Sequence, residues 1–231
     1  MTAPSFGIGT VACDAWRVLT FRSPSPAIGA HWRAYLAFGL GITWLAGVGR
    51  YWDNPRALLW QHLGLGSVVY VFCLALVLWV LLAPLKPQRW SYRNVLIFIT
   101  LTSPPAVFYA IPVERFMPLP EAQAANAWFL AVVALWRVAL LFWFLRRLAG
   151  LSWGAVVVAT LLPLTLIVVT LTVLNLEHVV FSIMAGIQPE QRSANDLSYG
   201  IVVLLAYFSI FAAPVFGGFY AWLVYRARSR D

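Results

Sequence analysis

Residues 128–147, "WFLAVVALWRVALLFWFLRR", decide the fold class of this chain of 231 residues. The stretch is apolar over the roughly 20 residues that a transmembrane helix requires, and it ends on the basic pair Arg146 and Arg147. Arg137 lies near its centre. A guanidinium at that depth is costly in a bilayer, so we expect its side chain to face the interior of a helix bundle or a water-filled cavity.

The composition of the whole chain favours the same class. Its residues are 62% hydrophobic and only 10% charged, whereas a soluble domain carries about 25% charged residues. We therefore predict an all-α, polytopic transmembrane helical bundle with about six spans. The third span is expected to be broken by two prolines. The predicted spans are residues 34–52, 65–85, 95–116, 127–145, 154–176 and 199–225.

The positions of the basic residues predict the orientation of the bundle. Most Lys and Arg residues lie before the first span, after the second and fourth spans, and in the C-terminal tail. By the positive-inside rule this places both termini in the cytoplasm. The net charge of +8 is thereby explained without nucleic acid as a partner. The predicted parts are a cytoplasmic N-terminal segment (1–33), a six-helix transmembrane domain (34–225) and a basic cytoplasmic tail (226–231).

The N-terminal segment carries a short amphipathic pattern. Asp14 and Arg17 lie off its apolar face, and Asp14 interrupts the apolar run that a cleaved signal peptide would need. Two readings stay open: an interfacial helix on the inner leaflet, or an unstructured arm. The apolar face consists of Val11, Ala15, Val18 and Leu19.

Arg137 is the leading candidate for a functional residue. At 1.5 Å per residue it lies about 15 Å into its span, near the bilayer midplane. Pro104 and Pro105 lack N–H groups, so the carbonyls of Thr100 and Leu101 lose their helical donors. Arg137 could donate to these carbonyls, which is a structural role, or it could bind an anionic substrate or lipid headgroup. The candidate midplane polar cluster is Arg137, Ser103, Pro104, Pro105, Thr43, Thr165 and Ser209.

A second group of polar residues is predicted at the outer face. Adjacent helical residues point about 100° apart and no paired-histidine motif occurs, so ion pairs between loops are favoured over a metal site. No metal or cofactor is expected. The chain has no nucleophile–base pattern or phosphate loop, so we do not expect an enzyme. The outer-face polar cluster is Asp53, His62, Glu114, Arg115, Glu177 and His178.

Small residues recur at helical spacing in two spans. "GLGITWLAGVG" (39–49) is predicted to allow close helix packing, as is the series Ala213, Gly217 and Ala221. Whether this packing lies within the chain or between subunits stays open. The expected partners are therefore the lipid bilayer and either a membrane-protein partner or a second copy of the chain.

Two stretches resemble bacterial Yip1-like polytopic membrane proteins. "WSYRNVLIFITLTSPPAVFYAIP" (90–112) looks like the proline-broken third span of that family. Residues 128–169 resemble its tandem span, basic turn and next span. The resemblance implies a non-catalytic integral protein of a bacterial cytoplasmic (inner) membrane that organises membranes or assists other proteins. The alternative is a small transporter or channel with a midplane site around Arg137, Ser103 and Ser209.

Overall fold

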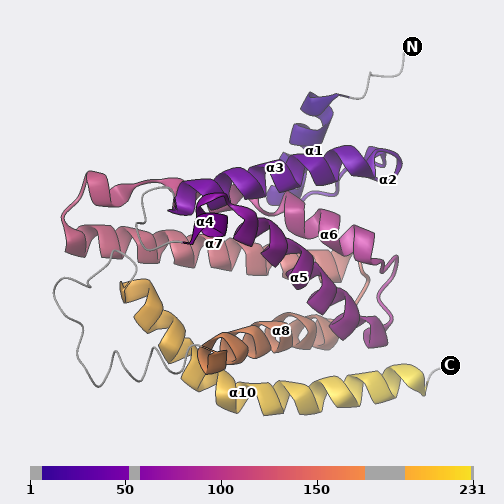
Figure 1. Ribbon diagram of the computed structural model, residues 1–231. Helices are drawn as coiled ribbons and strands as arrows, with labels where there is room; N and C mark the ends of the chain where they lie inside the picture. Colours follow the sequence, from indigo (N-terminus) through magenta and orange to yellow (C-terminus); the bar gives the residue numbers. More distant parts are fainter. Residues whose placement is uncertain (1–6, 52–57, 175–195, 230–231) are drawn as a thin grey trace.

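The computed structural model describes residues 7–51, 58–174 and 196–229, and every regular element in these ranges is a helix (Figure 1). The predicted all-α class is confirmed. The elements are α1 (Ile8–Leu19), α2 (Ala27–Ala30), α3 (Trp32–Tyr51), α4 (Leu59–His62), α5 (Leu65–Leu82), η1 (Ala83–Leu85), α6 (Tyr92–Leu101), η2 (Pro104–Ala110), η3 (Val113–Arg115), α7 (Leu119–Arg147), α8 (Trp153–Leu174) and α10 (Asp196–Arg228). The three η elements are short 3-10 helices.

Within the described ranges, four helices are long and apolar enough to cross a membrane. They coincide with the second, fourth, fifth and sixth predicted spans and indicate a membrane protein. The first and third predicted spans are not among the helices that are long and apolar enough to cross a membrane. α3 has 20 residues but includes Arg33 and Arg50, and α6 has only 10 residues. The four helices are Leu65–Leu85, Leu119–Arg147, Trp153–Thr170 and Gly200–Arg228.

The predicted third span takes the form of α6 followed by the 3-10 helix η2. α6 ends at Leu101, and η2 begins at Pro104. The Ser103 N–H donates to the Thr100 carbonyl at 3.1 Å. The Thr102 and Ser103 hydroxyls both donate to the Ile99 carbonyl, at 2.9 and 3.2 Å. Side chains of the helix itself therefore supply donors at the end of α6, a use of hydroxyls that is common where a helix ends or bends.

Glycines on α3 allow this helix to approach its neighbours closely. A β-carbon added at Gly39 would lie 2.5 Å from the β-carbon of Thr100 on α6, and one added at Gly47 would lie 2.7 Å from the Ser67 hydroxyl on α5. Both distances are far below van der Waals contact, so glycine is required at each position. The packing role predicted for this stretch is confirmed at these two glycines. Gly41 differs, because no atom lies within 4 Å of its added β-carbon.

The N-terminal segment forms helix α1, which excludes the unstructured arm. Its predicted apolar face is buried against the rest of the protein. The indole N–H of Trp136 on α7 donates to the Leu19 carbonyl at 3.0 Å and ties the end of α1 to the bundle. One part of the prediction was wrong: Asp14 lies on the buried face and is only 2% exposed. Hydrogen-bond donors of the chain offset the cost of burying its carboxylate.

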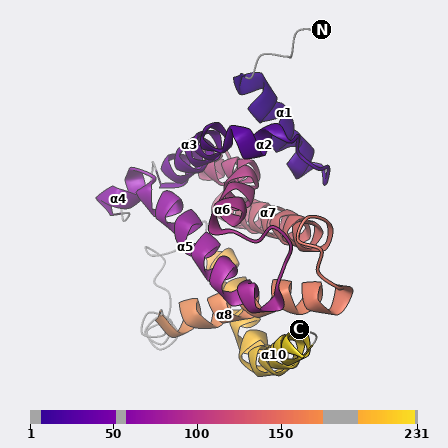
Figure 2. The same ribbon diagram turned by 90° about the vertical axis from the view of Figure 1, so that its right-hand side faces the viewer.

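The helices form three layers. Figures 1 and 2 show α3 and α6 on one side and α8 with α10 on the other, while α5 and α7 run between them. α8 packs along α10, and the Tyr220 hydroxyl of α10 donates to the Leu81 carbonyl of α5. Gly217, on the other hand, has open space around it. The small-residue series of α10 therefore does not pack against another described helix at this glycine.

Candidate functional site

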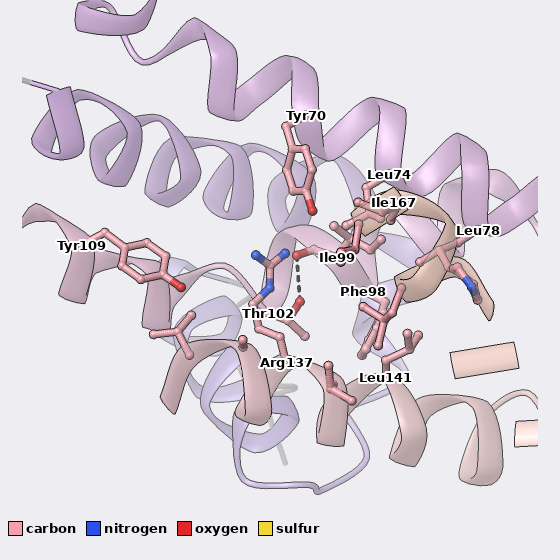
Figure 3. A pocket seen from close by; sticks show the side chains of 16 residues that line it. Tyr70, Leu74, Leu78, Phe98, Ile99, Thr102, Tyr109, Arg137, Leu141 and Ile167 are labelled. Carbon is pink, nitrogen blue, oxygen red and sulfur yellow. Dashed lines mark hydrogen bonds between the residues drawn. The ribbon is translucent and has the colours of Figure 1, made fainter. Parts of the chain in front are cut away.

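A pocket of about 230 Å³ lies where α5, α6, α7, α8 and η2 meet (Figure 3). α7 contributes Val133, Arg137 and Leu141, which are spaced four residues apart and so share one face of the helix. α5 contributes Tyr70, Leu74 and Leu78 with the same spacing. The remaining lining residues are Phe98, Ile99, Thr102, Tyr109, Ala134, Val138, Pro163, Leu164, Ile167 and Val168.

Arg137 carries the only formal charge among the sixteen residues that line the pocket. Its guanidinium projects into the pocket, with Tyr70 and Thr102 nearby and Tyr109 further along (Figure 3). The hydroxyl of Thr102 donates to the Ile99 carbonyl at 2.9 Å, which leaves its oxygen able to accept a hydrogen bond. The pocket is therefore positively charged, with hydroxyl groups close to the charge and apolar side chains elsewhere.

The expected pairing of Arg137 with the broken backbone is not present. The Thr100 carbonyl instead accepts from the Ser103 N–H. Arg137 is half-buried and has no hydrogen bond or ion pair with any residue in the described ranges. A guanidinium carries five N–H donors and no acceptor. Its donors are directed at the pocket, so a ligand that accepts hydrogen bonds and carries negative charge would complement the site.

The other members of the predicted midplane cluster lie outside this pocket. Thr43 is buried on α3 and donates to the Gly39 carbonyl at 2.8 Å. Thr165 donates to the Leu162 carbonyl at 2.9 Å. Ser209 is buried on α10. Ser103, Pro104 and Pro105 line no part of the pocket either.

The sequence reasoning missed Tyr70, Thr102 and Tyr109. Depth along a span was the criterion that selected the midplane cluster, and depth does not determine which face of a helix a residue occupies. Tyr70 does carry a signal, because Tyr70, Leu74 and Leu78 repeat at the four-residue spacing of one helical face. Tyr109 comes from the 3-10 helix after the prolines, and its place beside α7 depends on how that segment folds.

The outer-face cluster is described only in part. Asp53, Glu177 and His178 lie outside the described residues. Glu114 and Arg115 belong to η3, and His62 ends α4. The described part of the chain contains no group of three or more His, Cys, Asp or Glu residues that could hold a metal ion.

A second polar cluster joins α1 to α3 around Asp14. Its carboxylate accepts from the Ser25 N–H at 2.9 Å, from the Ser25 hydroxyl and from the Tyr35 hydroxyl at 2.6 Å. The Arg17 guanidinium lies 3.8 Å away. Burial alone would raise the pKa of Asp14, but the hydrogen bonds from Ser25 and Tyr35, together with Arg17, outweigh it and lower this pKa below its ordinary value of 3.8. The cluster is a structural link that fixes α1.

The link around Asp14 predicts a pH dependence. Because the folded-state pKa lies below the ordinary value, the stabilisation is fully present above about pH 4. It is lost as the pH falls through the folded-state pKa, when the carboxylate is protonated. We expect amide hydrogen exchange in α1 to accelerate below about pH 4, after correction for the intrinsic rate. Asp14→Asn should show fast exchange already at pH 6, whereas Cys13→Ser, at an exposed neighbouring position, should behave as wild type. Equal protection in Asp14→Asn and wild type at pH 6 would contradict the link.

Comparisons with known proteins give no match to the chain among family models, curated proteins or solved structures. The Yip1-like resemblance stays a prediction, and the function is argued from the geometry of the pocket.

Proposed function

We propose that this multi-pass membrane protein binds a small anionic ligand at Arg137, inside the bilayer, and that it acts as a small transporter or channel. The observation that supports this is the guanidinium that faces a pocket lined by three hydroxyl-bearing side chains and no acid. A charge at this depth costs about 2.5–3.5 kcal/mol on insertion scales. A bound anionic ligand would offset this cost by pairing with the guanidinium of Arg137.

We further propose six crossings, made by the four apolar helices, by α3 and by the broken third span α6–η2. Figure 1 supports a common orientation, because the starts of α3 and α6 and the ends of α7 and α10 lie at the same side of the molecule. The last turns of α7 and α10 both carry basic residues there. Under the positive-inside rule this side is cytoplasmic, in a bacterial inner membrane.

The proposed action is binding and passage rather than covalent chemistry. The guanidinium of Arg137 has N–H donors but no acceptor, so it is not suited to act as a general base. The other polar groups at the pocket are hydroxyls of tyrosine and threonine, with no histidine or carboxylate among the lining residues to activate them. Such a site recognises charge and shape. It offers no general-base route to breaking a bond.

Access of water to the pocket tests this proposal. In a Cys13→Ser, Cys73→Ser background, we would place single cysteines at Ala134, which lines the pocket, and at Ala139, which is exposed on the same helix and does not. A membrane-impermeant thiol reagent is then applied to either side of sealed vesicles. We expect Ala134→Cys to react from at least one side and to be protected by an anionic ligand. Ala139→Cys, which faces lipid, should stay unreactive.

Exposed Ser152, in the connection before α8, provides the positive control. If Ser152→Cys reacts while Ala134→Cys does not react from either side, the pocket is closed to water and the transport proposal is wrong.

A second candidate function is the non-catalytic, Yip1-like role in membrane organisation or in assisting a partner. The observation that favours it is one face of α10, where Phe208, Phe211 and Phe219 are 67%, 76% and 57% exposed. A row of exposed aromatic side chains on one helical face offers a contact surface for another transmembrane helix. This reading requires a membrane-protein partner or a homo-oligomer, and disulfide cross-linking of Phe211→Cys would detect the latter.

A further inference from the structure

We infer that the ligand of the Arg137 pocket is an amphiphilic monoanion: a carboxylate head joined to a short apolar chain. The inference rests on the proposed function and adds the class of ligand and its orientation. It follows from the difference between the two ends of the pocket, one of which is polar and the other apolar. The head would lie at Arg137 and the chain would extend toward Leu78 and Leu141 (Figure 3).

The polar end of the pocket is suited to one compact anion. In Figure 3, Arg137, Thr102 and Tyr70 lie close to one another, with Tyr109 further toward the same end. A planar guanidinium donates two parallel hydrogen bonds to a carboxylate or a phosphate. The Tyr70 hydroxyl, which lies beside the guanidinium in Figure 3, can donate to a remaining oxygen atom. One fixed positive charge matches one negative charge, so a multiply charged anion would be left under-compensated in a low-dielectric site.

The opposite end of the pocket offers only apolar surface. Leu74, Leu78, Phe98, Leu141 and Ile167 lie together there in Figure 3. Leu78 and Phe98 are 3% and 7% exposed, so their packing on neighbours fixes this wall. Phe98 is also stacked on Phe144, with the ring centroids 4.0 Å apart. An inorganic anion would leave this end unused, whereas an alkyl chain would fill it and gain the free energy of apolar burial.

The volume of the pocket sets an upper limit on the ligand. At about 230 Å³ it is smaller than the roughly 300–1,000 Å³ typical of sites for drug-sized molecules. A nucleotide would be too large, and both nucleotides and sugar phosphates carry more polar groups than the lining residues can satisfy. A medium-chain carboxylate has the right balance of one negative charge and a narrow apolar body.

The test uses the full-length protein in nanodiscs of zwitterionic lipid. Radiolabelled decanoate is the probe, and unlabelled decyl phosphate, acetate, inorganic phosphate and decanol are competitors. We expect decanoate to bind at least about 100-fold more tightly than acetate, because each buried methylene strengthens binding several-fold. Decyl phosphate, which carries close to two negative charges at neutral pH, should compete less well than unlabelled decanoate. Decanol, which lacks the charge, should not compete.

Two variants separate the two ends of the pocket. Arg137→Gln should weaken binding of all the anions. Leu141→Phe narrows the apolar end and should weaken decanoate more than hexanoate. Leu135→Phe is the matched control, because Leu135 is 70% exposed on the same helix and does not line the pocket.

The outcomes distinguish the inference from the function on which it rests. If acetate or phosphate binds as tightly as decanoate and depends on Arg137, the proposed anion function stands and the amphiphile inference is wrong. If decanol competes as well as decanoate, or if Arg137→Gln changes no affinity, both are wrong.

Discussion

Replacing Gly39 with leucine is expected to destabilise the bundle by about 1–3 kcal/mol, the usual cost of forcing atoms into a packed core. The added β-carbon would lie 2.5 Å from the Thr100 β-carbon and 2.9 Å from its carbonyl carbon. Thr100 cannot move aside easily, because it is fully buried and its hydroxyl donates to the Ile97 carbonyl at 2.9 Å. The clash therefore separates α3 from α6 rather than displacing one side chain.

Thermal unfolding in detergent would measure this effect. For a chain of this size, 1 kcal/mol corresponds to roughly 2–4 °C in Tm, so we expect a decrease of about 3–10 °C. Gly41→Leu is the matched control on the same helix, because an added β-carbon there meets no atom within 4 Å. Both variants gain the same helix propensity, so their difference isolates the helix contact. Equal melting temperatures for the two variants would contradict the packing of α3 on α6.

Features that depend on local composition could be predicted from the sequence. Apolar runs of about 20 residues correctly located four helices that are long and apolar enough to cross a membrane. The glycines of residues 39–49 correctly indicated close packing of α3, because only a residue without a side chain permits it. α1 was predicted as a helix from its apolar spacing, although as one of two alternatives. In each case the structure is determined by the hydrophobicity or the size of residues that are close together in the sequence.

Features that depend on tertiary contact could not be predicted. The sequence prediction places Asp14 off the apolar face of α1, but the structure buries it, because its hydrogen-bond donors come from Ser25 and Tyr35, later in the chain. Thr102 and Ser103 are sequence neighbours at nearly the same depth, yet only Thr102 lines the pocket. Tyr109 and Tyr70 lie on different elements that meet only in the folded bundle. Predicting the pocket requires knowing which face of each helix a residue occupies. The sequence indicated mainly how deep each residue lies along its span.

The structure also changes what is expected of Arg137. If this residue completed the backbone near Pro104, its loss would destabilise the protein. The Thr100 carbonyl instead accepts from the Ser103 N–H, and the hydroxyls of Thr102 and Ser103 donate at the end of α6. Arg137 has no hydrogen bond to lose among the described residues. The free energy spent on keeping its charge inside the bundle is then available for binding a ligand, which is the trade between stability and function seen at many binding sites.

Arg137→Leu is therefore expected to raise the stability of the ligand-free protein and to abolish binding of anions. Replacing a buried charge with an apolar side chain of suitable size is often neutral or stabilising by about 1–4 kcal/mol, which corresponds to an increase of several degrees in Tm. Tm would be measured with and without decanoate. Wild type should be stabilised by the ligand, because a ligand that binds only the folded state raises its stability, and Arg137→Leu should not respond.

Arg147→Leu is the control for this last experiment, because Arg147 is an exposed arginine at the end of the same helix and does not line the pocket. It should leave the response to decanoate intact. A decrease of several degrees in Tm for Arg137→Leu, without ligand, would mean that the guanidinium holds the bundle together. Ligand binding in the pocket would then not be needed to explain why Arg137 is present in this span. An increase in Tm combined with loss of the ligand response would assign Arg137 to recognition rather than to folding.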